Sequence, residues 1–352
     1  MSQSSKSPFG DFFDGARDSM LALQNRDGSI PWFHNGVIDP WNHLEAVMGL
    51  NLIGERQAAE HGIAFLRDSQ APDGSWWGQL GSAVPIDAEL HQFTMQGIET
   101  GHRIRDTNFI AYIATAIWHH YALHADLDFA HANWPMVKAA VDFVLALQSE
   151  HGDIRWAARD PGTPEDDALV TGNSSIHKSL ICAEKLAAAL GQDASHWHAA
   201  RRGLGEALAN KPERFDRTWE PKTRYSMDWY YPILSGALPQ PQAAARLKSR
   251  WDDFVVEGFG CRCVEEEPWV TVAESAELIL TLVAHGEPDK AREQLGWLDQ
   301  FRDETGAYWM GMQIEQKEFW PVERPAWTAG AVILAQDGVT QTTPAHGVLT
   351  QS

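Results

Sequence analysis

The chain has 352 residues, and its 28 lysines and arginines against 48 aspartates and glutamates give a formal net charge of −20. Such an acidic surface repels phosphate, which excludes nucleic acid as a partner and disfavours anionic membranes, leaving only peripheral contact through a local apolar patch. Three cysteines are an odd number and imply no disulfide framework. We find no signal peptide and no apolar stretch of transmembrane length, so we expect a cytoplasmic protein.

Helical periodicity predicts twelve helices, arranged along the chain in six successive pairs. The first helix of each pair is amphipathic, as in the stretch that places Val137, Val141 and Val144 on one face. The second is apolar on nearly all sides, as around Ile110 and Ile113, which is typical of a helix buried all round. The predicted pairs are 14–24 with 41–54, 56–70 with 107–124, 134–148 with 172–190, 195–209 with 227–238, 242–255 with 270–285, and 288–301 with 326–336.

Six amphipathic helices around six buried helices give an all-α fold, an (α/α)6 toroid with an outer and an inner ring. Strand signals are short and fall in the connections. We therefore expect one toroid domain over residues 14–338, between a flexible N-terminus, 1–13, and a flexible C-terminal tail, 339–352.

One turn motif supports this closed array of helices. The sequence Gln70-Ala-Pro-Asp-Gly74-Ser-Trp follows an amphipathic stretch and returns, with changes, after Gln24, Gln148 and Gln300. A unit of helix and turn that repeats along a chain is typical of stacked arrays, because each unit buries its apolar face only against its neighbours.

The segments that precede the inner helices carry the candidate functional residues. Inner helices of a toroid run parallel, so their N-termini meet at one rim of the central cavity. Helix capping explains Asp39 and Asp106, but it does not explain the aromatic side chains beside carboxylates, or Glu45 and Glu274 one turn further in. The substrate-binding candidates are Trp41, Glu45, Asn108, Tyr112, Trp229, Tyr230, Tyr231, Trp269, Glu323 and Trp327.

The stretch from Phe65 to Trp77 resembles the QW repeat of squalene–hopene cyclases. The six inferred pairs are similar to the α/α toroid that terpenoid cyclases share with protein prenyltransferases, and the chain resembles small bacterial prenyltransferase-like proteins. This resemblance implies acid-initiated cyclisation of an isoprenoid, in which a carboxylic acid protonates an alkene or epoxide and aromatic faces stabilise the cation. The chain lacks the Asp-x-Asp-Asp motif of those cyclases; the nearest match ends in Asp166-Asp167.

Within this interpretation Asp228 is the preferred acid, because flanking aromatic residues would desolvate it and raise its pKa. Asp167 is the alternative acid, and Asp106, Glu274 and His43 would orient the acid or remove the terminal proton. We expect no cofactor and no metal ion, because a lone Cys-x-Cys is a weak zinc signal.

A carbohydrate-active enzyme is the alternative, because many (α/α)6 toroids act on sugars and tryptophan platforms beside carboxylates suit sugar rings. Asp106, Asp228, Glu274, Glu323 or Glu45 would then supply the acid and base of a glycoside hydrolase, lyase or epimerase. His43, Tyr112 and Asn108 would bind hydroxyls. A non-catalytic ligand-binding toroid is the third possibility. The expected partner is a small molecule, either an isoprenoid or a sugar, and the sequence does not predict an oligomeric state.

Overall fold

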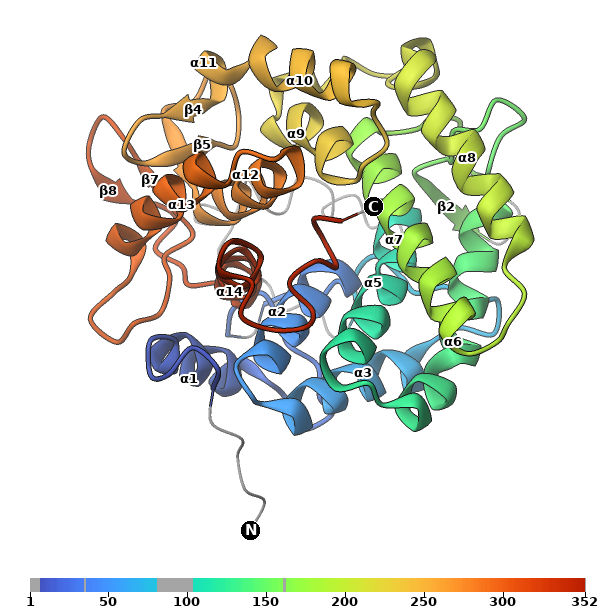
Figure 1. Cartoon of the computed structure of the whole chain (residues 1–352), viewed down its shortest axis with the longest axis horizontal. Helices are drawn as coiled ribbons and strands as arrows, with labels where there is room; N and C mark the ends of the chain where they lie inside the picture. Colours follow the sequence, from blue (N-terminus) through green and yellow to red (C-terminus); the bar gives the residue numbers. More distant parts are fainter. Residues whose placement is uncertain (1–6, 35, 81–103, 161–162, 352) are drawn as a thin grey trace.

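The computed structural model describes residues 7–34, 36–80, 104–160 and 163–351. In this part of the chain, two concentric rings of six helices surround a central axis (Figure 1). The inner ring consists of α2 (Pro40–Leu52), α5 (Thr107–His124), α7 (Val170–Ala189), α9 (Ser226–Leu234), α12 (Val272–His285) and α14 (Ala326–Thr340). The outer ring consists of α1 (Asp14–Leu23), α3 (Arg56–Ser69), α6 (Leu127–Leu145), α8 (Ser195–Asn210), α10 (Gln240–Ser249) and α13 (Pro288–Trp297). A short helix, α11 (Trp251–Phe254), follows α10.

The toroid prediction is confirmed, but the pairing of the helices is not. The predicted pairs begin with an outer helix, whereas the helices joined by short loops are an inner helix and the outer helix after it. Among the outer helices, α2 contacts α3 more than α1, and α5 contacts α6 more than α3. Short loops join these pairs, and short loops force antiparallel neighbours. The long connections run instead from each outer helix to the next inner helix. Their described parts therefore lie at the end of the toroid where the inner helices begin.

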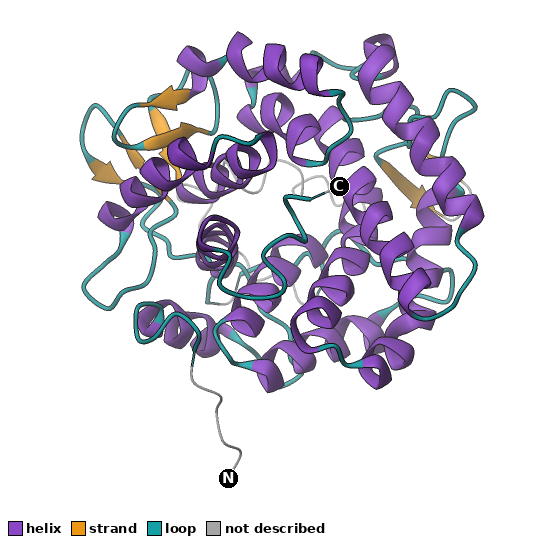
Figure 2. Ribbon diagram, in the orientation of Figure 1, coloured by secondary structure: helices purple, strands orange, loops and turns teal. Residues whose placement is uncertain are grey.

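These long connections make the description all-α only approximate. One sheet has the order β1 (Arg105–Asp106), β2 (Ala157–Asp160), β3 (Thr163–Pro164). The other has the order β4 (Val255–Val256), β5 (Gly260–Arg262), β6 (Trp269–Thr271), β7 (Gly311–Gln313), β8 (Glu318–Phe319). Both are antiparallel, and Figure 2 shows them outside the inner ring. Pairing satisfies backbone groups that partly buried connections would otherwise leave without partners.

The inner ring closes where the first inner helix meets the last. Helices α2 and α14 pack through two glycines, and a Cβ atom added to Gly49 would lie 2.7 Å from the Cα atom of Gly330. A Cβ atom on Gly330 would collide with the carbonyl of Glu45. The two backbones can approach this closely only because neither residue has a side chain.

The repeated turn joins neighbouring helices of the outer ring. The side-chain amide of Gln70 donates to the carbonyl of Gly74 at 2.9 Å and to that of Met136, on α6, at 3.0 Å. Gln24 and Gln148 make the equivalent pairs of bonds, reaching α3 and α8. Each turn thus bonds the helix before it to the next outer helix.

The glycine of each turn is required by both its conformation and its surroundings. Gly74 has φ +90°, and Gly28 and Gly152 have similar positive values. A side chain at Gly74 would collide with the carbonyl of Ala139 on α6. In the fourth copy the turn at Thr305 packs against Gly15 of α1, so the outer ring also closes between its last and first helices.

After α14 the chain turns back over one opening of the ring. Asp337 accepts hydrogen bonds from the backbone and hydroxyl of Thr343, and Ala345 and Val348 are buried. The buried ammonium of Lys178 donates to the carbonyl of Gln351 at 2.9 Å. The terminal segment is therefore bonded to the wall of the inner ring. The division into residues 1–13, 14–338 and 339–352 stays a prediction.

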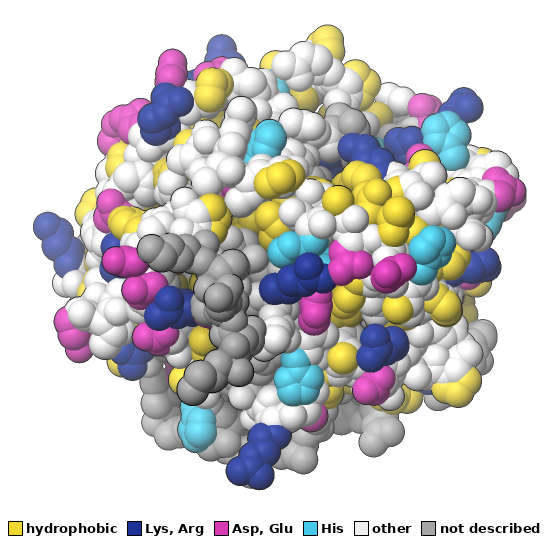
Figure 3. All heavy atoms as spheres, turned by 60° about the horizontal axis from the view of Figure 1, so that its bottom comes forward, with side chains coloured by type: hydrophobic (Ala, Val, Ile, Leu, Met, Phe, Trp, Pro, Cys, Tyr) yellow, Lys and Arg dark blue, Asp and Glu magenta, His cyan; other side chains and the backbone are white. Residues whose placement is uncertain are grey.

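The described surface carries mixed charge. On the face in Figure 3, basic side chains lie among acidic ones and do not gather in one patch. Ion pairs such as Arg201–Glu184, with an N–O distance of 2.6 Å, tie outer to inner helices. No helix in the described ranges is long and apolar enough to cross a membrane.

Candidate active site

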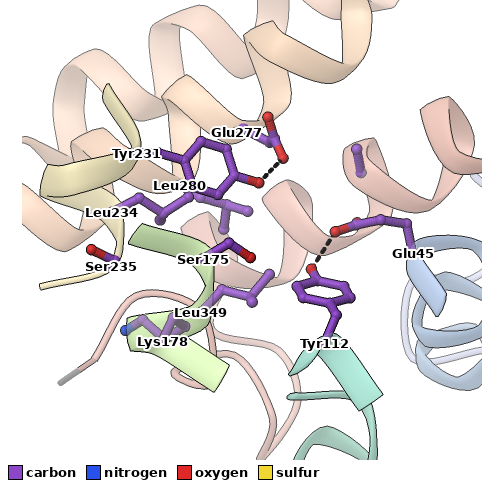
Figure 4. A pocket seen from close by; sticks show the side chains of 11 residues that line it. Glu45, Tyr112, Ser175, Lys178, Tyr231, Leu234, Ser235, Glu277, Leu280 and Leu349 are labelled. Carbon is purple, nitrogen blue, oxygen red and sulfur yellow. Dashed lines mark hydrogen bonds between the residues drawn. The ribbon is translucent and has the colours of Figure 1, made fainter. Parts of the chain in front are cut away.

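The inner helices enclose a chamber on the axis of the toroid (Figure 4). Every inner helix contributes to its wall, and the terminal segment contributes Leu349. One part of the wall is apolar and the other carries carboxyl, hydroxyl and ammonium groups. The lining residues are Glu45, Tyr112, Ser175, Lys178, Tyr231, Leu234, Ser235, Glu277, Leu280, Ala331 and Leu349.

Two carboxyl groups of the chamber are held by tyrosine hydroxyls. Tyr112 donates to Glu45, while Tyr230, at 2.6 Å, and Tyr231 both donate to Glu277. Burial raises the pKa of Glu45 to about 7, and burial together with the charge of Glu45 raises the pKa of Glu277 to about 8; the tyrosine donors oppose both shifts. Near neutral pH the chamber can therefore hold protonated carboxyl groups.

Glu277 was not among the predicted site residues, although the sequence contains a signal for it. It lies three residues after Glu274, in a helix that is otherwise apolar on most sides. A carboxyl group in such a helix needs either a polar partner or the open axis. Glu277 has both, because the two tyrosines meet it at the chamber wall.

An aromatic cluster lies beside the chamber. The ring of Trp41, at the start of α2, lies 5.9 Å between centroids from each of Phe109, Tyr112 and Tyr231. These residues come from α2, α5 and α9, so the cluster brings three inner helices together. Trp41, Tyr112 and Tyr231 were predicted to bind substrate, and the structure groups them.

The rim carries two helix-capping aspartates close to this cluster. Asp39 accepts from the backbone of Asn42 at 2.9 Å and from the indole of Trp32, and burial raises its pKa. Oδ1 of Asp106 accepts from the backbone of Asn108, at 2.9 Å, and of Phe109, at 3.2 Å. Burial, with a smaller contribution from the charge of Asp39, raises the pKa of Asp106 to about 7, against the effect of the two backbone donors.

Glu274 lies in the first turn of α12 and is partly exposed. Its carboxyl group neighbours the thiol of Cys263, whose pKa is raised by burial and by this charge. Helices α5 and α12 are the second and fifth of the six inner helices and contact different neighbours, so they stand on opposite sides of the ring. Asp106 and Glu274 therefore begin opposite walls of the same mouth.

Three other rim candidates lie further round the same end. Trp327 packs edge-on against Trp32, with centroids 5.1 Å apart. The indole of Trp269 donates to the carbonyl of Trp320 at 2.7 Å. Glu323 is partly buried just before α14, and this burial raises its pKa.

The structure places two predicted catalytic residues among structural contacts. His43 accepts at Nδ1 from the backbone of Ile30 and lies 3.0 Å, at Nε2, from the carbonyl of Gly62; burial lowers its pKa to about 4. Asp167 accepts from the backbone and hydroxyl of Thr218, at 2.6 and 2.8 Å, in the connection before α7. Neither side chain lines the chamber.

The preferred acid of the cyclase hypothesis is buried near the start of α9 and does not line the chamber. Asp228 is buried beside Arg246 of α10, whose guanidinium donates to the Asp228 carbonyl at 2.7 Å. Burial raises the pKa of Asp228 to about 6 against the opposing charge of Arg246. The indole of its neighbour Trp229 donates to the carbonyl of Arg246, so Trp229 faces the outer ring.

In the described ranges, no three histidine, cysteine, aspartate or glutamate side chains gather in a geometry that could hold a metal ion. Cys261, Cys263 and Cys182 are buried free thiols. Burial raises the pKa of Cys261, which keeps it protonated.

Comparison with solved structures defines the class of fold. A wild-type glycosidase superposes with a TM-score of 0.67 at 15% identity, covering 99% of this chain and 100% of the other. A GH63 mannosylglycerate hydrolase from Thermus thermophilus gives 0.68 at 12% identity, covering 92% and 99%. A D-mannose isomerase gives 0.64 at 11% identity, covering 97% and 99%. The fold is therefore the α/α toroid found in these carbohydrate-active enzymes.

The sequence relationship is more specific. No family model matches the chain. The MMP endo-(1,4)-3-O-methyl-alpha-D-mannosidase of Mycolicibacterium hassiacum is 42% identical over 325 residues, which cover 92% of this chain and 85% of the mannosidase. The chain belongs to the family of that mannosidase and is a glycosidase-type enzyme.

This relationship corrects the cyclase hypothesis. The resemblance to terpenoid cyclases and prenyltransferases was wrong as an assignment of family, and an isoprenoid substrate is not supported. The carbohydrate-active alternative is confirmed at the level of a glycosidase. The physical reason is visible in the repeated turn: its glutamine and glycine join outer helices and take no part in the lining of the chamber.

Proposed function

We propose that this protein hydrolyses internal α-(1,4) linkages in a polymer of 3-O-methylated mannose. The observation that carries this proposal is the 42% identity with the endo-mannosidase over 92% of the chain. The aromatic cluster around Trp41 and the carboxyl groups at the mouth supply what such a substrate needs: apolar faces for sugar rings and a pair of groups for acid–base catalysis. The cytoplasmic location remains a prediction from the sequence.

Asp106 is the general acid in this proposal. Its Oδ1 atom accepts both capping N–H groups, so Oδ2 is the oxygen that carries the proton. With a pKa of about 7, the carboxyl group stays protonated up to neutral pH and can donate to the glycosidic oxygen as the bond breaks. Asp39 assists by its charge and does not touch the substrate.

Glu274 is the general base. It lies in the first turn of α12, which stands across the inner ring from α5, and it is partly exposed, so water can reach it. Glu274 takes a proton from the attacking water, the water oxygen bonds to the anomeric carbon, and the bond to the leaving oxygen breaks as Asp106 protonates it. Attack from the face opposite the leaving group inverts the anomeric configuration.

The test compares Asp106→Asn and Glu274→Gln with wild type on 3-O-methylated α-(1,4)-mannan oligosaccharides. Each substitution should lower kcat by about 100-fold or more, because a group that transfers a proton in the transition state is lost. Asparagine still caps helices, so the Tm of the Asp106 variant should change little. NMR of the first product should show the inverted anomer.

The matched control is Asp126→Asn, the same change at the cap of the outer helix α6. It should leave kcat unchanged. Wild-type activity that survives in both rim variants, or a first product with retained configuration, would contradict the assigned roles. No cleavage of any α-(1,4)-mannan oligosaccharide by wild type would contradict the function itself.

A further inference from the structure

A pair of tryptophans lies on the rim next to Asp106. Trp156 and Trp219 are both partly exposed, and their rings lie 5.6 Å apart between centroids at an angle of 56°. The carbonyl of Trp156 accepts from the backbone of Thr107, the residue after Asp106, at 2.9 Å. Strand β2, which begins one residue after Trp156, pairs with β1, which ends at Asp106. The pair is therefore continuous with the mouth of the toroid.

Asp167 holds the connections that carry the two rings. Its carbonyl accepts from the backbone of Trp156 at 3.0 Å, and its carboxylate accepts from the backbone of Thr218 at 2.6 Å. Its pKa is lowered: the backbone and hydroxyl donors around the carboxylate outweigh burial, which acts in the opposite direction. An ionised Asp167 thus bonds to the backbone of both segments at once.

The polar atoms around the rings suit a ligand rich in oxygen. The indole N–H of Trp219 donates to Asp216 at 3.0 Å, which fixes the ring, and the ammonium of Lys222 lies 5.0 Å from the ring centroid. The buried Nε1 atom of Trp156 has no hydrogen-bond partner among the described residues. The ring faces of the two tryptophans and the ammonium of Lys222 are therefore the groups that a ligand can contact.

We propose that Trp156 and Trp219 form an accessory subsite that binds a sugar unit of the polymer away from the cleaved bond. This inference rests on the proposed function. An endo-acting hydrolase holds its chain beyond the two units that flank the cleaved linkage. The pair offers aromatic surface and a cation at Lys222, both on the same rim as Asp106. Methyl ethers add apolar surface to a sugar, and aromatic rings bury such surface well.

The test measures kcat/KM of Trp219→Ala on methylated mannan oligosaccharides of increasing length. The variant should lose about tenfold on the longest oligosaccharides, through KM, and nothing on the shortest substrate that is cleaved. Asp167→Asn should show a smaller loss with the same dependence on length, because Asp167 positions the rings without touching the sugar. Both variants should keep the wild-type kcat at saturation.

Trp309→Ala is the matched control, since Trp309 is also partly exposed but stacks on Phe319 of β8. It should leave the dependence on length unchanged. A Trp219→Ala variant that responds to chain length as wild type does would overturn the subsite and leave the function standing. If the wild-type protein cleaved no mannan oligosaccharide, the proposed function would be overturned. In that case, tryptophan fluorescence of the wild-type protein that does not change on adding the longest oligosaccharide would overturn the subsite as well.

Discussion

Each long connection of the toroid has two halves, and the two halves differ in kind. The half that follows the outer helix carries the glutamine–glycine turn in connections one, two and three, with nearly the same bonds each time. The half that precedes the inner helix is different in every connection, from Asp39 beside Trp41 to Pro268 beside Trp269. The first half is similar in these connections because it has the same structural role in each, which is to join neighbouring outer helices. In our proposal the second half varies because the mouth holds a single active site, to which each connection contributes different residues.

This difference explains how a repeated motif can point to the wrong chemistry. The turn around Gln70 and Gly74 reports how the outer ring is assembled, and any toroid assembled in that way can carry it. In our proposal the reaction depends on residues such as Asp106 and Glu274, each of which has its catalytic role in one connection only. Substitutions in the two halves should therefore separate stability from catalysis.

The largest effect in the first half is expected for Gly74→Ala. The new methyl group would collide with the carbonyl of Ala139, and alanine would also be strained at φ +90°. We expect a loss of about 3 kcal/mol in the free energy of unfolding, measured by chemical denaturation. The specific activity of the folded fraction should stay that of wild type.

Gly191→Ala provides the comparison, because Gly191 also has a positive φ but no atom within 4 Å of the added Cβ. It should cost about 1 kcal/mol, from backbone strain alone. Equal losses at the two positions would mean that the contact between turn and helix contributes nothing.

Gln70→Ala should have the next largest effect. It removes both hydrogen bonds from the turn and leaves the carbonyl of Met136 without its side-chain donor. We expect a loss of about 2 kcal/mol in denaturant unfolding, with KM and kcat unchanged. A Gln70→Ala variant with wild-type stability but reduced kcat would contradict the assignment of the first half to stability and the second half to catalysis.

In the second half, Asp39→Asn should shift the pH dependence of the reaction. The general acid must be protonated, so kcat/KM should fall as pH rises through the pKa of Asp106, about 7. The charge of Asp39 contributes to that high pKa, so removing the charge should move the alkaline limb to lower pH. Asp126→Asn should leave the profile in place, and a limb that stays fixed in Asp39→Asn would argue against Asp106 as the acid.

The smallest effect concerns the chamber and the pH dependence of stability. Glu277 has a pKa of about 8 in the folded protein, above its usual value near 4.5, so the folded state binds a proton that the unfolded chain releases. The stability that this proton contributes is present at low pH and lost as pH rises toward 8. The Tm of Glu277→Gln should therefore rise relative to wild type between pH 5 and pH 8. Glu304 is exposed, so Glu304→Gln should show no such rise in Tm. If Glu304→Gln showed the same rise, the effect would not come from the proton on Glu277.

The sequence predicted the helices and the two rings well, because the spacing of apolar residues distinguishes a helix buried on one face from a helix buried on all sides. The offset between predicted and observed hairpins has a different cause. Helix spacing carries no information on which neighbour packs more closely, whereas loop length does: only Ala125 and Asp126 separate α5 from α6.

The candidate site was predictable in part. Trp41, Tyr112 and Tyr231 stood out as aromatic residues at the starts of inner helices, and they meet. Asp228 stood out for the same reason, yet it does not line the chamber, because the surroundings of a helical residue depend on neighbours that are distant in sequence. Glu277 was missed because its tyrosine partners come from another helix.

Closure of both rings between the first and last hairpins has a consequence for synthesis on the ribosome. Helix α2 can pack against α14, and α1 against the turn at Thr305, only after more than 250 further residues have been translated. Until then the nascent chain is an open arc with an apolar flank at its leading end. Any stall or truncation before the last hairpin leaves that flank uncovered, which makes incomplete chains of this protein natural clients for chaperones and proteases.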